Sequence, residues 1–258
     1  MRKLSVTDVS TIEAKIGNFI SQVPVRTALT YLKAALPEGA VLYLVGGAIR
    51  NQIIESIHGY RPAIEDIDLF VDNVAGDTLL AELLPAGRCF RTDLGGVRWK
   101  PAGSIYSVDI CLLRDFTIIK KYGLKPHLDN LLSALDFTMN TVVFDTDRGR
   151  LYERNALTDI RQRRMAFNTK MLYNKTATAY RTLLLRHKTG FMLSQGVFDF
   201  VKQAIDLETL IKVRQILANR LGSRTMRDIM HDYDRICAYE HFNDYRRHAL
   251  EALLAGDC

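Results

Sequence analysis

A short apolar run that stops at a glycine pair is the feature that most constrains the fold of this chain. Val41–Val45 has the length and composition of a buried strand, and Gly46-Gly47 ends it. Isoleucines follow at helical spacing, so we predict a helix that ends near His58-Gly59. A strand, a glycine turn and a helix in this order begin a mixed α/β domain, in which helices cover a sheet.

Further strands are predicted after this helix. Apolar or alternating segments bounded by turn residues lie at 64–71, 90–92, 96–100 and 104–112. A short helix is expected at residues 76–84, and a hairpin turn at Pro101-Ala102-Gly103. Two helices, at 8–22 and 23–35, precede the first strand. The strands and turns together describe a small mixed sheet.

The remainder of the chain is predicted to be helical. One apolar stripe has the spacing of a helix face and is typical of core packing: Met226, Ile229, Met230, Tyr233 and Ile236. A last helix is expected at residues 241–254. The overall prediction is an α+β fold, with a mixed-sheet domain and its N-terminal helices at residues 1–168 and a helical domain at 169–258.

Composition indicates an ordinary globular protein. Hydrophobic residues make up 48% of the 258 residues and charged residues 25%. Residues 40–49 are the longest apolar stretch, which is too short to span a bilayer, and the first twenty residues contain no signal-peptide core. Four scattered cysteines indicate neither a zinc site nor a disulfide framework. We therefore expect a cytoplasmic protein with no membrane partner.

The positive charge is concentrated in one segment. The net charge is +6, and residues 160–198 contain no Asp or Glu. The basic residues of this segment are Arg161, Arg163, Arg164, Lys170, Lys175, Arg181, Arg186 and Lys188. A solvated helix face usually mixes both signs, because like charges repel along it. The segment therefore favours binding of phosphate groups, in an NTP, a nucleic acid or both.

The glycine pair is a candidate phosphate site. Gly46 and Gly47 leave the backbone N–H groups accessible, and the start of a helix adds partial positive charge. Arg50, one turn into the helix, lies where it could reach a phosphate oxygen. The alternative is a tight turn with a surface arginine.

Three acids on predicted strands are candidate metal ligands. Asp66 and Asp68 alternate with Ile67 on one strand, so both carboxylates point to the same face, about 7 Å apart. Their repulsion is a cost unless a cation offsets it. Asp109 is central in another apolar strand and needs either a partner or a metal. Three carboxylates after a phosphate-binding turn are what metal-dependent phosphoryl or nucleotidyl transfer requires.

Three stretches resemble the head domain shared by tRNA CCA-adding enzymes and bacterial poly(A) polymerases, within the nucleotidyltransferase superfamily. Leu44-Val45-Gly46-Gly47-Ala48-Ile49-Arg50-Asn51 is similar to the Gly-Gly-x-Val-Arg-Asp motif, and Glu65-Asp66-Ile67-Asp68-Leu69 to the Asp-x-Asp metal strand. Leu135-Asp136-Phe137-Thr138-Met139-Asn140 resembles the Arg-Arg-Asp-Phe-Thr-x-Asn-Ala segment. A weaker match runs from Tyr180-Arg181 to Gly190-Phe191, so the matches cover about residues 40–192 in family order.

The resemblance implies a polymerase-beta-like head followed by a neck-like helical domain. It implies that Asp66 and Asp68 hold Mg²⁺ (or Mn²⁺) and that Asp109 occupies the position of a third carboxylate. It further implies roles for other residues around an incoming NTP. Gly46, Gly47 and Arg50 would engage the triphosphate, Asp136 the ribose, with Asn140 shaping that pocket, and Arg181 would lie near phosphate or base.

Several positions depart from the family pattern. Asn51 replaces an aspartate, and Ala134-Leu135 replace the paired arginines. The Glu-Asp-x-x-Arg motif that reads C and A would fall on residues 174–178, where none of its key residues is present. The segment before Asp66 is longer than usual, and about 67 residues follow Phe191. Recognition of C and A requires fixed polar groups against the base edge, so strict CCA synthesis is not expected.

The leading hypothesis is transfer of a nucleoside monophosphate from an NTP to the 3′ hydroxyl of an RNA, with tRNA as the expected partner and pyrophosphate as the second product. One rival is a compact nucleotidyltransferase that modifies a small molecule, a protein or a nucleotide, as toxins and defence effectors do. A second is a non-catalytic module that binds NTP or RNA.

Two local patterns have simpler interpretations than a site. Trp99, Phe90 and Tyr106 favour core or hairpin packing, although Arg91, Arg98 and Lys100 leave a base-stacking platform open. The dipeptide His231-Asp232 is typical of a surface helix rather than of a metal phosphohydrolase.

Overall fold

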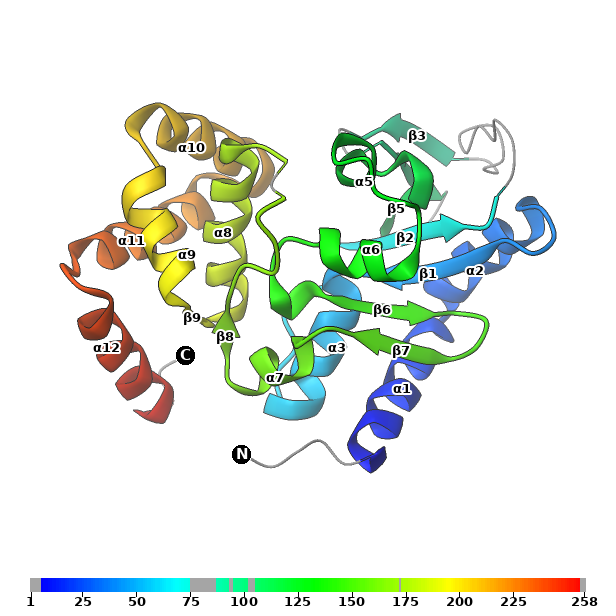
Figure 1. The fold of residues 1–258 in the computed structure, drawn as a ribbon, viewed down its shortest axis with the longest axis horizontal. Coiled ribbons are helices and arrows are strands. Elements are labelled where there is room, and N and C mark those ends of the chain that lie inside the picture. Colours follow the sequence, from blue (N-terminus) through cyan, green and yellow to red (C-terminus); the bar gives the residue numbers. More distant parts are fainter. Residues whose placement is uncertain (1–5, 75–86, 93–94, 102–104, 172, 256–258) are drawn as a thin grey trace. The chain divides into compact units, whose positions relative to one another are not determined.

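The computed structural model describes residues 6–74, 87–92, 95–101, 105–171 and 173–255 (Figure 1). The predicted helix at 76–84 and the tip of the predicted turn at Pro101-Ala102-Gly103 lie outside the described residues. The chain divides into two compact units. We call Met1–Leu135 with Asn140–Leu157 the sheet unit, and Asp136–Met139 with Thr158–Cys258 the helical unit.

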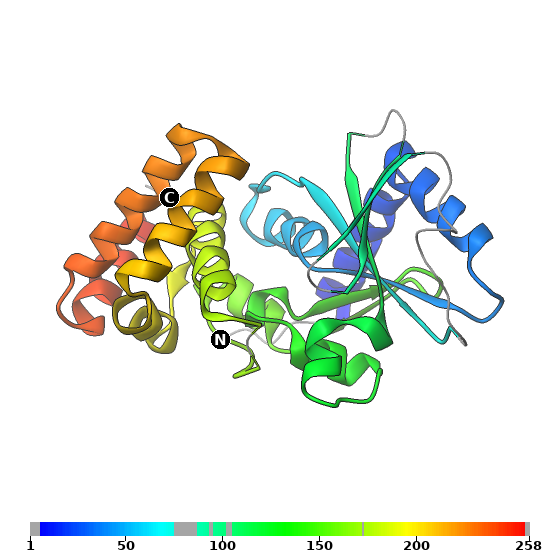
Figure 2. The same cartoon turned by 90° about the horizontal axis from the view of Figure 1, so that it is seen from above.

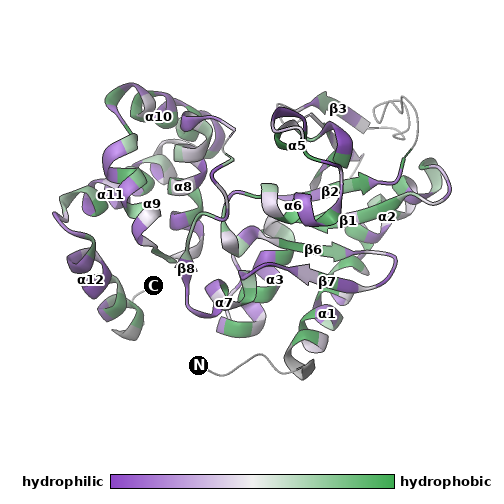
Figure 3. Cartoon of the chain, in the orientation of Figure 1, coloured by the Kyte–Doolittle hydropathy of each residue, from purple (hydrophilic) through white to green (hydrophobic). Residues whose placement is uncertain are grey.

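The sheet unit contains a seven-stranded mixed sheet in the order β3-β4-β5-β2-β1-β6-β7. Among the described strands of this sheet only β2 and β5 pair in parallel, and the other neighbours are antiparallel. The strands are β1 (Val41–Val45), β2 (Asp66–Asp72), β3 (Gly87–Arg91), β4 (Val97–Pro101), β5 (Ser107–Leu112), β6 (Val142–Asp145) and β7 (Arg150–Glu153). Figure 3 shows the inner strands β1 and β6 as hydrophobic and the edge strand β3 as hydrophilic.

One part of the core of this unit lies on the sheet face opposite Asp66 and Asp68. Leu42, Leu44, Ile67 and Leu69 are buried there, and helix α3 packs against β1, β2 and β6. Their period of two follows from the pleat of the strands, which sends alternate side chains to opposite faces. The helices of the unit are α1 (Val6–Ile20), α2 (Val23–Ala35), α3 (Gly47–His58), η1 (Leu113–Asp115), α5 (Thr117–Lys121) and α6 (Leu128–Ala134).

Two short helices cross the limits of the units, η2 (Thr138–Asn140) and α7 (Ala156–Arg161). The helical unit then continues through β8 (Arg164–Met165), α8 (Lys175–Thr189), β9 (Met192–Leu193), α9 (Gln195–Asp199), the π-helix η3 (Phe200–Ala204), α10 (Leu207–Leu221), α11 (Ser223–Ala238) and α12 (Phe242–Ala255). Helices α8, α10 and α11 pack side by side (Figure 2).

The predicted apolar stripe of α11 contributes to this helical packing. Ile229, Met230 and Ile236 are buried, while Met226 and Tyr233 are partly exposed. Asn174 caps the start of helix α8. At its end Gly190 adopts a left-handed conformation, and its backbone N–H donates to the carbonyl of Arg186. The helical character predicted for the C-terminal part is therefore confirmed.

The α+β fold, with a mixed sheet, N-terminal helices and a C-terminal helical region, is confirmed. The two compact units do not define where independently folding domains meet, so the boundary at residue 168 stays a prediction. None of the helices in the described ranges combines the length and hydropathy that crossing a bilayer requires.

Candidate functional site

Asp66 and Asp68 begin strand β2 and share one of its faces. Between and after them, Ile67 and Leu69 point to the opposite face, where they are 1% and 0% exposed. Both aspartates are partly exposed, and Asp68 lies directly beside Val45, the last residue of β1. The alternation in the sequence thus places two carboxylates at the end of β1, where the glycine turn begins.

Gly46 lies directly against one of these carboxylates. Its φ is +75°, and a Cβ at this position would lie 2.7 Å from Oδ2 of Asp68. No side chain can occupy that space without moving the carboxylate, and positive φ is itself unfavourable for other residues. The structure therefore brings the predicted phosphate turn and the predicted metal strand together, and it explains the glycine at position 46.

Asp109 lies next to Asp68 across the parallel pairing of β5 with β2. On its other side it faces Arg98 of β4. Arg98 donates from Nε to Oδ1 of Asp109 at 2.7 Å and from Nη2 to Oδ2 at 2.6 Å, and the same Nη2 lies 3.5 Å from Oδ2 of Asp66. Hydrogen bonding to Asp109 raises the pKa of the Arg98 guanidinium further above its ordinary value.

This pairing answers the question that the sequence left open for Asp109, because its partner is Arg98. In the described part of the chain no group of three or more His, Cys, Asp or Glu side chains is arranged to hold a metal. Asp66 and Asp68 remain as a possible oxygen donor set. Mg²⁺ is commonly held by one or two carboxylates together with substrate phosphates rather than by a complete protein cage. The residues present therefore fit a magnesium ion that a triphosphate helps to bind.

Arg50 is buried rather than on the surface, with 4% of the residue exposed. Its Nε and Nη2 donate to Oδ1 of Asn51 at 3.0 and 2.9 Å, and Nη1 donates to Oδ1 of Asn140 at 2.7 Å. Both amides are also buried. The structure thus joins Arg50 and Asn140, which are predicted site residues, and two neutral side chains fix the orientation of the guanidinium.

Asn51 also holds the long segment that precedes Asp66. Its Nδ2 donates to the carbonyls of Pro62 and Ala63 at 3.0 and 3.1 Å. An aspartate could accept from Arg50 but could not donate to these carbonyls. The amide of Asn51 thus contacts both Arg50 and the segment that precedes Asp66, which an aspartate could not do in the same way.

The other two predicted nucleotide residues lie in the helical unit and contact each other. Arg181 of α8 donates from Nε to Oδ2 of Asp136, while Oδ1 of Asp136 accepts from the backbone N–H of Phe137 at 2.8 Å. About half of the Arg181 side chain is exposed. The carboxylate is thereby held in one orientation by two donors.

The basic segment is less uniform than its sequence implies. Four of its cations form ion pairs with acids outside it: Arg164 with Asp159, Lys175 with Asp206, Arg181 with Asp136 and Arg186 with Asp232. The acids are distant in sequence or just before the segment, so a local count of charges misses them. Asp232, the acid of the His231-Asp232 dipeptide, is one of these partners.

Asp159 is a buried acid that the sequence pattern does not indicate. It accepts from Nε and Nη2 of Arg164 at 2.7 and 2.5 Å and from the hydroxyl of Thr138. Thr138 belongs to the stretch that resembles the family's Asp-Phe-Thr motif. Its contact assigns the threonine a structural role within the helical unit.

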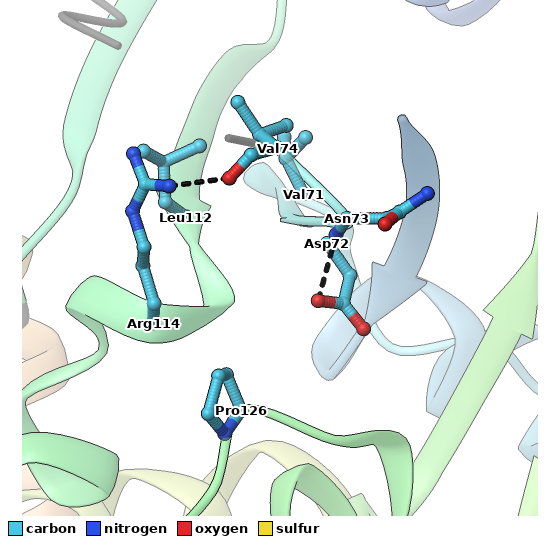
Figure 4. A pocket seen from close by; sticks show the side chains of 7 residues that line it. All are labelled: Val71, Asp72, Asn73, Val74, Leu112, Arg114 and Pro126. Atoms are coloured by element: carbon cyan, nitrogen blue, oxygen red, sulfur yellow. Dashed lines mark hydrogen bonds between the residues drawn. The ribbon is translucent and has the colours of Figure 1, made fainter. Parts of the chain in front are cut away.

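A hollow of about 280 Å³ lies at the other end of β2 from Asp66 and Asp68 (Figure 4). Arg114 points across it and donates to the carbonyl of Val74, and Asp72 accepts from the backbone N–H of Asn73 at 2.8 Å. The residues that line it include none of the predicted site residues. This hollow is therefore separate from the candidate site.

Solved structures share the fold of the chain. A CCA-adding enzyme in complex with CTP matches with a TM-score of 0.61 and 17% identity, over 89% of this chain and 54% of that one. A Thermotoga maritima CCA-adding enzyme complexed with tRNA gives 0.53 and 18%, over 91% and 52%. A tRNA-processing enzyme with CTP gives 0.52 and 18%, over 77% and 53%.

The chain spans about half the length of these enzymes. No protein-family model matches it, and no curated protein matches it in sequence. The chain shares its fold with these CCA-adding and tRNA-processing enzymes, as the three sequence stretches predicted.

Proposed function

We propose that the chain is a metal-dependent nucleotidyltransferase that moves a nucleoside monophosphate from an NTP to the 3′ hydroxyl of an RNA, with tRNA as the acceptor. The observation that carries the proposal is the contact between Gly46 and Asp68, beside Asp66. A phosphate-binding turn and a carboxylate pair need to be adjacent for this chemistry, since a cation held by the carboxylates would neutralise charge on the triphosphate. The fold it shares with CCA-adding enzymes, some in complex with CTP, ATP or tRNA, supports this proposal.

In this proposal the acceptor oxygen attacks the α-phosphorus of the NTP. A bond forms between the acceptor oxygen and the α-phosphorus, and the bond from the α-phosphorus to the oxygen that bridges it to the β-phosphorus breaks. Pyrophosphate leaves with that oxygen, and the proton of the acceptor hydroxyl passes to solvent. Asp66 and Asp68 would hold Mg²⁺ or Mn²⁺, which when bound supplies charge neutralisation at the phosphates and lowers the pKa of the acceptor hydroxyl. The backbone at Gly46 and Gly47 would bind phosphate oxygens, with the charge of Arg50 behind it.

The remaining site residues would act on the nucleotide itself. Asp136, oriented by Arg181 and by the N–H of Phe137, would accept hydrogen bonds from the ribose hydroxyls. Asn140 would hold Arg50 toward the triphosphate through its hydrogen bond. Asp109 would act through Arg98, whose position it fixes.

Base choice is where this chain would differ from CCA-adding enzymes. Asn174 caps helix α8 by accepting from the N–H of Ala177 at 2.7 Å, and Lys175 pairs with Asp206. At these positions of the missing base-reading motif, Asn174 thus caps α8 and Lys175 pairs with the residue that caps α10. This favours, as a second candidate, a nucleotidyltransferase with the same chemistry and a different acceptor.

The test is transfer of label from each α-labelled NTP in the presence of Mg²⁺ and total tRNA. The matched control is Asp66→Asn/Asp68→Asn, which keeps side-chain size and removes charge. Label on RNA with wild type alone would support the proposal and identify the base. Label on a small molecule or protein would favour the second candidate, and nucleotide binding without any transfer would contradict both.

A further inference from the structure

The sheet face that carries Asp66 and Asp68 continues outward into a basic, aromatic surface. The paired residues in one row across four strands are Asp68, Asp109, Arg98 and Phe90. Paired residues on neighbouring strands point to the same face. Two residues along β3 and β4, Arg88 pairs with Lys100 on that same face. We call Arg88, Phe90, Arg98 and Lys100 the β3–β4 strip.

The strip has the features of a surface that binds single-stranded nucleic acid. Phe90 is 58% exposed although it is a large apolar side chain, and every residue of β3 is exposed. In the described parts of the chain, neither Arg88 nor Lys100 forms an ion pair. Exposed aromatic rings stack on bases of any sequence, and cations beside them bind the phosphates between the bases.

Trp99 separates this surface from ordinary core packing. It lies between Arg98 and Lys100, so it points to the opposite face, where it is fully buried. The aromatic residues that the sequence grouped together thus have two roles. Trp99 anchors β4 in the core, whereas Phe90 stays outside the core and its ring is available to a ligand.

The charge of the side chains on this face changes from positive on β3 and β4 to negative on β5 and β2. Moving from β3 to β2, the side chains change from Phe90 and the cations to the acids Asp109, Asp68 and Asp66. With strands ~4.8 Å apart, Phe90 lies about 14 Å from Asp68 along the sheet. A strand of nucleic acid bound on the cations would have its end directed to the carboxylates, where the proposed transfer requires a hydroxyl.

We propose that the β3–β4 strip binds the single-stranded 3′ end of the RNA acceptor, with a base stacked on Phe90 and backbone phosphates on Arg88 and Lys100. The inference rests on the proposed function, because it names where that function's acceptor lies. Arg98 is the innermost cation and is fixed by Asp109. It lies between the cations proposed to bind RNA phosphates and the carboxylates proposed to hold the metal.

The experiment measures binding of a 5′-fluorescein single-stranded RNA with a free 3′ hydroxyl to the full chain by fluorescence anisotropy. Phe90→Ala is expected to weaken binding roughly tenfold or more, and Phe90→Trp to retain it. Arg88→Ala/Lys100→Ala is expected to reduce the slope of log Kd against log salt by about 1.4. All these side chains are exposed, so thermal unfolding should match that of wild type.

Arg91→Ala is the matched control. Arg91 lies on the same exposed strand as Arg88 but pairs with Val97, which puts it on the other face. It should leave RNA affinity close to that of wild type. If Arg91→Ala lost as much RNA affinity as the Arg88→Ala/Lys100→Ala variant, the proposal for the strip would be wrong, because net charge alone would then explain binding.

Two further readouts separate failure of the strip from failure of the proposed function. If variants of the strip bind RNA and transfer label to it as wild type does, the proposed role of the strip is wrong and the proposed function stands. If they lose NTP affinity in parallel with RNA affinity, the strip holds the NTP rather than the acceptor. If wild type binds no RNA and transfers label elsewhere, both proposals fail.

Discussion

Arg98 donates two hydrogen bonds to Asp109, at 2.7 and 2.6 Å, and places the same guanidinium 3.5 Å from Asp66. A protein cation therefore lies between Asp109 and the carboxylate pair that we propose to hold the metal. Of the three acids at the candidate site, Asp109 is the one that Arg98 holds through two hydrogen bonds. This relationship decides how the site would respond to metal.

Arg98→Ala is expected to bind Mn²⁺ more tightly, on the order of tenfold, because Asp109 then adds its charge to Asp66 and Asp68. Without metal the variant should be less stable by about 1 kcal/mol or less, since the lost ion pair is partly exposed. Electron paramagnetic resonance of free Mn²⁺ measures the affinity, and urea denaturation measures the stability.

Arg88→Ala is the control for this comparison, because it removes the same charge from the same sheet face without touching Asp109. It should leave Mn²⁺ affinity nearly unchanged. Weaker Mn²⁺ binding by Arg98→Ala would contradict the interpretation, since Arg98 would then be supporting the metal rather than withholding a ligand.

The sequence predicted the carboxylate pair because strand periodicity is local. Asp66 and Asp68 share a face in any strand that covers the Ile64–Val71 region. Arg98 could not be assigned to Asp109 in the same way, because their contact depends on the register of β4 against β5. Register is set by the turn between strands and by burial of one face, and a shift of one residue would turn Arg98 away.

The same limit applies to contacts between distant segments. Arg50 and Asn140 were both predicted as site residues, yet ninety residues separate them and nothing local indicates their hydrogen bond. Asp159 was missed because its carboxylate is satisfied by Arg164 and Thr138 only after folding. The fold class was predictable from periodicity, whereas pairing of charges required the tertiary structure.

Gly46→Ala should both destabilise the sheet unit and weaken metal binding. Positive φ and a Cβ 2.7 Å from Asp68 Oδ2 are expected to cost about 1–3 kcal/mol. Because the strain acts on Asp68, Mn²⁺ affinity should fall as well. Urea denaturation and Mn²⁺ titration of the same preparation give both quantities.

Gly123→Ala provides the matched control for this substitution. Gly123 also has positive φ, at +61°, but a Cβ there would meet no atom within 4 Å. It should lose about 1 kcal/mol through backbone strain and keep wild-type Mn²⁺ affinity. Equal effects of the two alanines on Mn²⁺ would show that the contact between Gly46 and Asp68 is irrelevant to the metal.

Asn51→Asp tests whether the Asn51 amide holds the segment before Asp66 in place. The carboxylate would gain charge-assisted hydrogen bonds from Arg50 but would face the carbonyls of Pro62 and Ala63, which now accept from Nδ2. The buried carbonyl of Pro62 would then lack a donor, at about 1–3 kcal/mol, whereas Ala63 is exposed and its carbonyl can accept from water, so we expect net destabilisation. A variant as stable as wild type in urea would show that these carbonyls do not require the amide.

Arg164 tests which cations of the basic segment are structural. Arg164→Met leaves the fully buried Asp159 carboxylate without its ion pair, and such losses cost about 3–5 kcal/mol. Asp159→Leu/Arg164→Met should recover much of that loss, because it removes the buried charge as well. Lys170→Met is the comparison: within the described residues Lys170 forms no ion pair, so its loss should leave stability within about 0.5 kcal/mol. If Arg164→Met were as stable as wild type but bound RNA more weakly, Arg164 would belong with the phosphate-binding cations after all, and the ion pair with Asp159 would not be what fixes its position.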